Sequence, residues 1–168
     1  MHFRIEQFFD AAPEVVCEAL YDASYLAAMG ELPDLSAATQ QSLECGTDVV
    51  SQALEFQFRG KLPSAVTRVI DARRLTWLQH DEIDLRTSRC RFRLVPIHYQ
   101  RFFTCSGTWV LTPDPAGSRR VIEGQLKVNS PVPFVGGTVE KAIVTGLKER
   151  LADEPAVFAR WHAGRTAR

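Results

Sequence analysis

The feature that most constrains the fold is a two-residue alternation that runs through the second half of the chain. In SRCRFRLV, which begins at Ser88, arginines alternate with Cys90, Phe92 and Leu94. YQRFFTCSGTWVLT and VIEGQLKV repeat the pattern, and the turn-forming run PDPAGS separates them. Alternation with period two places side chains on opposite faces of a strand, and tight turns join antiparallel neighbours. The pattern therefore predicts an antiparallel sheet with one wet face and one covered face.

The first 30 residues predict one strand followed by two short helices. Residues 2–9, HFRIEQFF, alternate well enough to form a strand. Pro13 suits the first turn of a helix, where its missing N–H costs nothing. Asp22 or Ser24 is a suitable N-cap for a second short helix, which Gly30 is expected to end.

The middle of the chain predicts two more strands and a less regular helix. Strands are expected at 39–45 and 49–59, with Gly46 in the turn between them. LPSAVTRVID, residues 62–71, has apolar residues at helical spacing and a proline near its start. In the second strand, the large apolar side chains on the predicted inner face are Leu54, Phe56 and Phe58.

The last third of the chain predicts one long amphipathic helix. From Thr138, apolar residues recur at helical spacing: Val139, Ile143, Leu147, Leu151, Phe158 and Trp161. A helix of about 24 residues would be about 36 Å long, enough to lie across a sheet. Pro155 is expected to kink or restart this helix, because a proline inside a helix costs about 3 kcal/mol.

The order of elements and one local motif resemble a known superfamily. The segment SPVPFVGGTVEKAIVTGLKERL, after the strand VIEGQLKV, is similar to an uncharacterised bacterial branch of the START/polyketide-cyclase (SRPBCC) superfamily, a domain of unknown function. That superfamily includes lipid-transfer proteins, relatives of plant pollen allergens and aromatase/cyclases. The resemblance implies one α+β helix-grip domain over residues 1–168, in which a curved antiparallel sheet wraps around a long C-terminal helix. The sequence departs from the pattern of that superfamily in two places. The short turn ECGTD replaces a glycine-rich loop that the plant relatives have, and Pro155 interrupts a last helix that is usually continuous.

Composition excludes several classes of partner from the prediction. The 168 residues contain 20 basic and 20 acidic side chains, so no net field attracts nucleic acid or an anionic membrane. No stretch approaches 18 uninterrupted apolar residues, so stable membrane insertion is not expected. The N-terminus has no export signal, and the four cysteines lack a CxxC pair, which predicts reduced thiols in a cytoplasmic protein.

Three local patterns look like sites but have plainer explanations. HDEID places His80, Glu82 and Asp84 on one side of a strand, but a solvated hairpin end is commoner than a metal site. The sequence therefore predicts no metal and no cofactor. The arginines of SRCRFRLV share no face with aromatic residues, so a solvated strand face is favoured over nucleic-acid binding.

The glycines around the start of the last helix do not match a phosphate-binding loop. VGGTVEK fits neither of the common glycine-rich phosphate motifs, so Gly136 and Gly137 are interpreted as a turn into the helix. Gly146 lies within the helix, where it costs about 1 kcal/mol relative to alanine. Close contact with the sheet is the favoured explanation, and space for a ligand is the alternative.

The predicted inner face is aromatic and nearly free of charge. Its polar groups are Gln7, Gln52 and two thiols, with the strand at 75–83 left unassigned. Apolar surroundings with a few placed polar groups are typical of ligand sites. The predicted ligand-binding residues are Phe56, Phe58, Phe92, Phe103, Trp109, Leu126, Val139, Ile143 and Leu147.

Three functions remain open from the sequence. The first is a non-enzymatic module that holds a lipid, isoprenoid or polyketide-like molecule between the sheet and the last helix. The second is an aromatase/cyclase- or dehydratase-like enzyme with a titratable group in the cavity, for which the candidates are Tyr25, His80, Glu82 and Tyr99. The third is a protein-interaction module with a filled core and an apolar patch near Phe158 and Trp161. No catalytic residue is assigned, and the sequence does not predict an oligomeric state.

Overall fold

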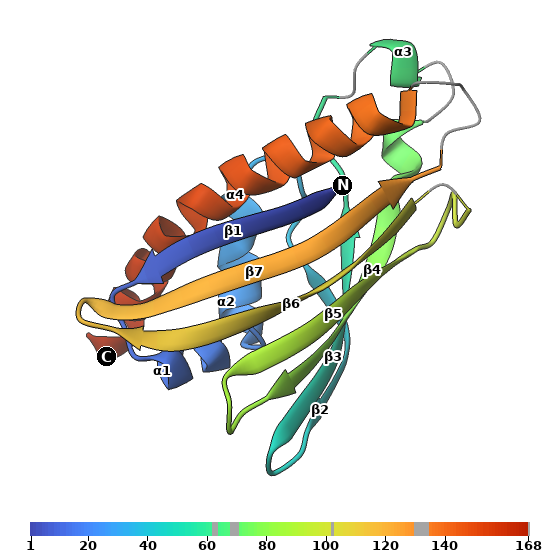
Figure 1. Ribbon diagram of the computed structural model, residues 1–168. Coiled ribbons are helices and arrows are strands. Elements are labelled where there is room, and N and C mark those ends of the chain that lie inside the picture. The colour runs from blue at the N-terminus through green and yellow to red at the C-terminus, as the bar shows by residue number, and fades with distance from the viewer. Residues whose placement is uncertain (62–63, 68–70, 102, 130–134, 168) are drawn as a thin grey trace.

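A seven-stranded antiparallel sheet and one long helix dominate the computed structural model, which describes residues 1–61, 64–67, 71–101, 103–129 and 135–167 (Figure 1). The strand order is β1-β7-β6-β5-β4-β3-β2, so that every neighbouring pair except β1–β7 is also consecutive in the chain. The strands are β1 (His2–Phe9), β2 (Thr39–Cys45), β3 (Val49–Gln57), β4 (Thr76–Asp84), β5 (Arg89–Pro96), β6 (Phe103–Asp114) and β7 (Gly117–Val128).

The helices lie where the sequence predicted them, with one exception in detail. Helix α1 (Pro13–Ala19) and helix α2 (Ala23–Ala28) follow β1, and a 3-10 turn, η1 (Met29–Glu31), continues α2. The predicted cap is confirmed, because the Asp22 carboxylate accepts hydrogen bonds from the backbone N–H groups of Ser24 and Tyr25 at 2.8 and 3.3 Å. The helix predicted at 62–70 is described only as α3 (Ser64–Thr67), followed by η2 (Ala72–Arg74); the flanking residues 62–63 and 68–70 lie outside the described residues.

The predicted inner and outer faces of the strands are confirmed. Along β1 the side chains alternate from exposed to buried without a break, and Phe3, Ile5, Gln7 and Phe9 point inward. In β5 the three arginines are exposed and Cys90 is completely buried opposite Trp109 of β6. The alternation arises because one face of the sheet is covered by helix α4 (Val135–Thr166) together with α1 and α2.

Helix α4 is continuous through Pro155, so the helix does not restart there as one of the two predicted outcomes required. Proline at 155 has no N–H to donate to the carbonyl of Leu151, the residue four positions earlier. The side-chain amide of Gln7, which points inward from β1, donates to that carbonyl instead at 2.5 Å. A buried side chain from the sheet thus replaces the missing helix hydrogen bond, which explains why the helix tolerates the proline.

The layer between sheet and helix is packed solid at only one end. The last turns of α4 lie beside α1 and α2 (Figure 1). There Phe158 is fully buried, with its ring edge-on to Phe9 and Tyr25 at centroid distances of 5.3 and 5.9 Å. Toward the start of α4, by contrast, the inward-facing Ile143 and Leu147 remain half-buried. The helix therefore closes the core at its C-terminal half and leaves space under its N-terminal half.

Candidate functional site

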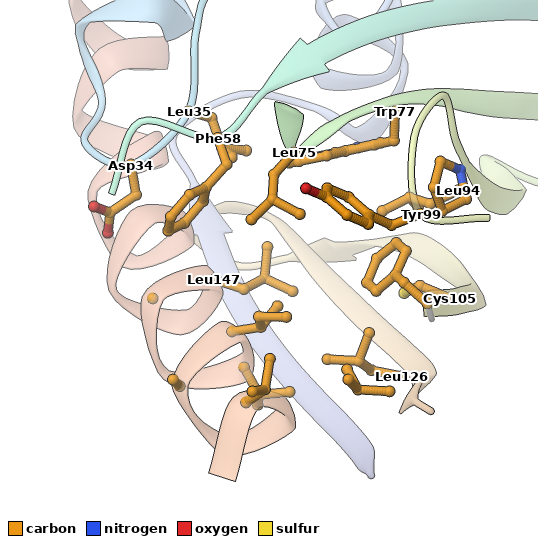
Figure 2. A pocket seen from close by; sticks show the side chains of 18 of the residues that line it. Asp34, Leu35, Phe58, Leu75, Trp77, Leu94, Tyr99, Cys105, Leu126 and Leu147 are labelled. Atoms are coloured by element: carbon orange, nitrogen blue, oxygen red, sulfur yellow. The ribbon is translucent and has the colours of Figure 1, made fainter. Parts of the chain in front are cut away.

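A cavity of about 200 Å³ occupies the space between the first half of α4 and the sheet (Figure 2). On one side the cavity is lined by β1, β4, β5, β6 and β7 together with the segments before β2, after β3 and after β5. On the other side it is lined by α4. The aromatic lining residues are Phe3, Phe58, Trp77, Tyr99 and Phe103, and the aliphatic ones include Leu35, Leu75, Leu94, Leu126, Val139, Ile143 and Leu147. The side chains that surround this space are thus mostly apolar.

Six of the nine residues predicted to bind ligand lie on this wall. They are Phe58, Phe103, Leu126, Val139, Ile143 and Leu147. Their role in binding stays a prediction, because the geometry places them around a space without showing what enters it.

The other three predicted residues face inward but do not line the cavity. Phe56 stacks on Trp77 with ring centroids 6.0 Å apart. Phe92 covers Gly107, where a Cβ atom would lie only 2.6 Å from the ring. Trp109 is 6% exposed and belongs to the filled core opposite Cys90. Strand parity identifies the face of a side chain but not its position along the strand, which decides whether it reaches the cavity.

The sequence missed Trp77, one of the large aromatic groups of the wall. The inner face of its strand was left unassigned, yet β4 has the ordinary alternation, with Trp77, Gln79, Asp81 and Ile83 facing inward. The available signal was Ile83, because isoleucine is among the residues most often buried and it shares parity with Trp77.

The four residues considered for catalysis lie in three different places. Tyr99 lines the cavity and has a left-handed backbone conformation (φ 59°). Its hydroxyl accepts a hydrogen bond from the Asp71 N–H at 3.2 Å, and the guanidinium carbon of Arg74 lies 5.6 Å from the centroid of its ring. Tyr25 is buried at the filled end of the core. His80 and Glu82 belong to the outer face of β4, where Glu82 pairs with Arg91 of the neighbouring strand. These four residues therefore do not form one site.

A buried ion pair crosses the core between sheet and helix, and it corrects the expectation that the inner face carries no securely placed titratable group. Arg120 of β7 and Glu154 of α4 form a hydrogen-bonded pair with exposed side-chain fractions of 4% and 1%. Arg120 also donates to Gln7 at 2.7 Å, and Tyr25 donates to Glu154 at 3.0 Å. Burial raises the pKa of Tyr25, so its hydroxyl keeps its proton and remains a donor. Arg120 shares strand parity with Ile122, and this signal was present in the sequence.

A second buried carboxylate, Asp81, lies on the inner face of β4. Its oxygens accept hydrogen bonds from the side-chain amides of Gln52 and Gln79 at 2.9 to 3.2 Å. Burial raises the pKa of Asp81 to about 6, while the two amides and the charge of Arg120 oppose that rise. Asp81, Arg120 and Glu154 are not among the lining residues of the cavity, so they are parts of the core rather than of the site.

The cavity adjoins a shallow groove between α4 and the loop after β3. Its charged residues are Asp34, Arg59, Lys61, Lys141 and Glu149, and Asp34, Lys61 and Gly146 line both spaces. Among the described residues outside its own helix turn, a Cβ atom at Gly146 would have one neighbour within 4 Å, Oδ2 of Asp34 at 3.4 Å. The favoured explanation of Gly146 as a close contact with the sheet is therefore wrong, and the glycine instead leaves space between cavity and groove. Gly136 and Gly137 lie in the first turn of α4.

Arg150 of α4 attaches the loop beside the cavity to the helix. Its guanidinium donates to the backbone carbonyls of Met29, Leu32 and Pro33 at 2.8 to 2.9 Å. Burial lowers the pKa of Arg150, and the nearby carboxylates of Glu154 and Asp34 oppose this change. These bonds hold the residues immediately before Asp34 against the helix.

Two features are absent from the described parts of the chain. Within them, no group of three or more histidine, cysteine, aspartate or glutamate side chains is placed to hold a metal ion. Among the described helices, none combines the length and the apolar character needed to cross a bilayer.

Comparison with known proteins places the chain in a family and a fold. The sequence model of the family described as "Protein of unknown function (DUF2505)" matches residues 4–161. No curated protein matches the chain.

The solved structures that match share the complete architecture. TTHA0849 from Thermus thermophilus is 21% identical, with 95% of this chain and 99% of that chain covered at a TM-score of 0.64. The Zhui aromatase/cyclase from Streptomyces sp. R1128 is 18% identical, with 100% and 96% covered at a TM-score of 0.66. Ara h 8.0201 is 16% identical, with 95% and 98% covered at a TM-score of 0.56. At these identities the likeness shows the fold, and it confirms the predicted helix-grip architecture.

Proposed function

We propose that this chain, which belongs to the DUF2505 family, binds a small apolar molecule in the cavity between the sheet and the first half of α4. The observation that carries the proposal is the unequal packing of α4. The C-terminal half of the helix is sealed against the sheet by Phe158, whereas Ile143 and Leu147 in its N-terminal half face a space of about 200 Å³. Apolar side chains left half-buried around a concave space are the usual lining of a ligand site.

The volume of the cavity limits the size of the ligand. An apolar cavity of about 150 Å³ is enough to hold benzene, and drug-sized ligands occupy about 300–1,000 Å³. A cavity of about 200 Å³ therefore accommodates the equivalent of one or two aromatic rings. A longer lipid or polyketide-like chain would have to extend through the groove beside Lys61 and Gly146.

The aromatic wall favours a planar, unsaturated ligand. Phe58, Trp77 and Phe103 approach the cavity from three different segments. In Figure 2, Phe58, Trp77 and Tyr99 lie on one side of the space, and Leu147 and Leu126 lie on the opposite side. Offset and edge-to-face ring contacts contribute about 0.5–1.5 kcal/mol each beyond the burial of area. A ring system placed among these side chains would be stabilised both by the ring contacts and by the burial of its apolar surface.

The proposal is tested by titrating naphthalene, a two-ring apolar probe, and measuring the bound fraction by equilibrium dialysis, a readout that does not depend on the number of tryptophans. The blocking variant is Leu147→Trp, because it fills the cavity from the helix side with a rigid side chain. The matched control is Leu43→Trp, the same substitution at an exposed position of β2 outside the cavity. Saturable binding to the wild type and to the Leu43 variant, with at least tenfold weaker binding to the Leu147 variant, is the expected result.

Two outcomes of this titration contradict the proposal. Binding that is equally strong in the wild type and in Leu147→Trp would place the probe elsewhere on the protein. A wild type that does not bind naphthalene, while it remains folded by circular dichroism, would show that the cavity does not admit a ring of this size.

A further inference from the structure

We propose that Asp34 is the polar recognition group of the cavity and that it accepts a hydrogen bond from a hydroxyl group on the ligand. This inference rests on the proposed function and specifies its ligand as a neutral one- or two-ring compound with an O–H group, such as a phenol. Asp34 lines both the cavity and the groove, and Figure 2 shows it beside Phe58 at one edge of the cavity.

The backbone of Asp34 is held from two sides. From α4, Arg150 binds the carbonyls of Leu32 and Pro33, the residues immediately before it. From the sheet, the N–H of Arg59 donates to the carbonyl of Asp34 itself at 2.7 Å. Asp34 has a φ of 68°, a left-handed conformation in which aspartate is tolerated better than most residues. The backbone position of Asp34, from which its side chain extends, is therefore fixed before any ligand arrives.

The carboxylate itself sits in a slot between two glycines. A Cβ atom at Gly60 would lie 2.5 Å from Oδ1, and one at Gly146 would lie 3.4 Å from Oδ2. Glycine at 60 thus leaves the room that the carboxylate occupies, and glycine at 146 keeps its other side open toward cavity and groove.

The carboxylate has no direct partner within the described residues. None of their donors lies within hydrogen-bonding or ion-pairing distance of Oδ1 or Oδ2 of Asp34, although the charge of Arg150 is near enough to interact with it electrostatically. Arg150 directs its hydrogen bonds to three backbone carbonyls instead. A half-buried carboxylate that is held in place but lacks a donor is suited to accept one from a ligand.

The charges around Asp34 favour a neutral donor over a charged ligand. Arg150, Arg59, Lys61 and Lys141 would repel a cationic group that approached the carboxylate. An anionic group would meet the charge of Asp34, and the exposed Lys61 and Lys141 remain in water, where ion pairs contribute little. A hydroxyl group avoids both costs and forms a charge-assisted hydrogen bond, one of the stronger kinds.

The test compares three probes of the same ring size: naphthalene, 2-naphthol and 2-naphthoate. At neutral pH, 2-naphthol is expected to bind about tenfold more tightly than naphthalene. Asp34→Gly, which preserves the left-handed backbone and removes the carboxylate, is expected to abolish this tenfold preference, measured as the ratio of the 2-naphthol and naphthalene affinities within the same variant. Asp34→Asn keeps an acceptor without the charge and is expected to retain part of the preference.

The outcomes separate this inference from the proposed function. If naphthalene binds and Leu147→Trp blocks it, but 2-naphthol has no advantage or keeps its advantage in Asp34→Gly, the role of Asp34 is refuted and the cavity stands. If 2-naphthoate binds most tightly, the lysines and not Asp34 select the ligand, which also refutes the inference. If Asp34→Gly no longer binds naphthalene, the 2-naphthol preference is measured in Asp34→Asn instead. A preference as large as that of the wild type would then refute the role of Asp34.

Discussion

Breaking the buried pair between Arg120 and Glu154 is expected to destabilise the protein more than removing both charges. The two side chains are 4% and 1% exposed, so water cannot replace a lost partner. Arg120→Met leaves Glu154 charged in the core, for which the typical cost is about 3–5 kcal/mol. Tyr25 and Gln7 still donate to Glu154, but two hydrogen bonds from neutral groups do not compensate a buried charge.

The double variant Arg120→Met/Glu154→Gln removes the stranded charge. Its neutral amide retains the size of the glutamate, and its single carbonyl oxygen can still accept from one of the two donors, Tyr25 or Gln7. The remaining losses are one or two hydrogen bonds, at about 1 kcal/mol each. The double variant is therefore expected to be at least 1 kcal/mol more stable than Arg120→Met alone. The coupling free energy, which is the cost of the double variant minus the sum of the two single-variant costs, is expected to exceed the deviation of about 0.3–0.5 kcal/mol that independent sites show.

Urea denaturation measures these differences, provided that the slope of free energy against urea stays constant among the variants. Arg119→Met is the matched control, because Arg119 is the neighbour of Arg120 on the outer face of β7 and its side chain is 44% exposed. The control is expected to change the free energy of unfolding by less than about 0.5 kcal/mol. An Arg120→Met variant as stable as the control, or single-variant costs that simply add, would refute the reasoning.

Two further predictions concern the core. The pKa of Asp81 is raised from 3.8 to about 6 on folding, so protonation stabilises the folded state, and stability decreases as the pH rises through this window. Between pH 5 and pH 7.5 the wild type is expected to lose about 1.4 kcal/mol of unfolding free energy relative to Asp81→Asn; parallel pH profiles in urea titrations would show that Asp81 does not titrate there. Pro155→Ala is expected to stabilise the protein by less than about 1 kcal/mol, against about 3 kcal/mol for a typical interior proline, because Gln7 already satisfies the Leu151 carbonyl. A gain near 3 kcal/mol in thermal or urea unfolding would contradict this explanation of the tolerated proline.

The fold followed from local patterns that one sequence displays. Alternation in β5, β6 and β7 identified the covered face, and the helical spacing from Val139 to Trp161 identified the element that covers it. Pro155 was misjudged because its compensation comes from Gln7, a residue 148 positions earlier, and local propensity contains no information about such a contact.

The site was less accessible from sequence than the fold. Phe103 and Trp109 have the same parity on the same strand, yet of the two only Phe103 lines the cavity, because Trp109 lies further along the strand in the filled core. Asp34 lies between η1 and β2 with a left-handed backbone, and the two glycines beside its carboxylate, Gly60 and Gly146, come from distant parts of the chain, so no local pattern indicated it. Arg120, by contrast, could have been found from parity with Ile122.

The most direct test of the central claim is a crystal structure of the protein grown in the presence of naphthalene. The account predicts planar electron density between α4 and the sheet, in contact with Phe58, Phe103 and Leu147. An empty or collapsed space at this position, in crystals that hold the probe elsewhere or not at all, would contradict it.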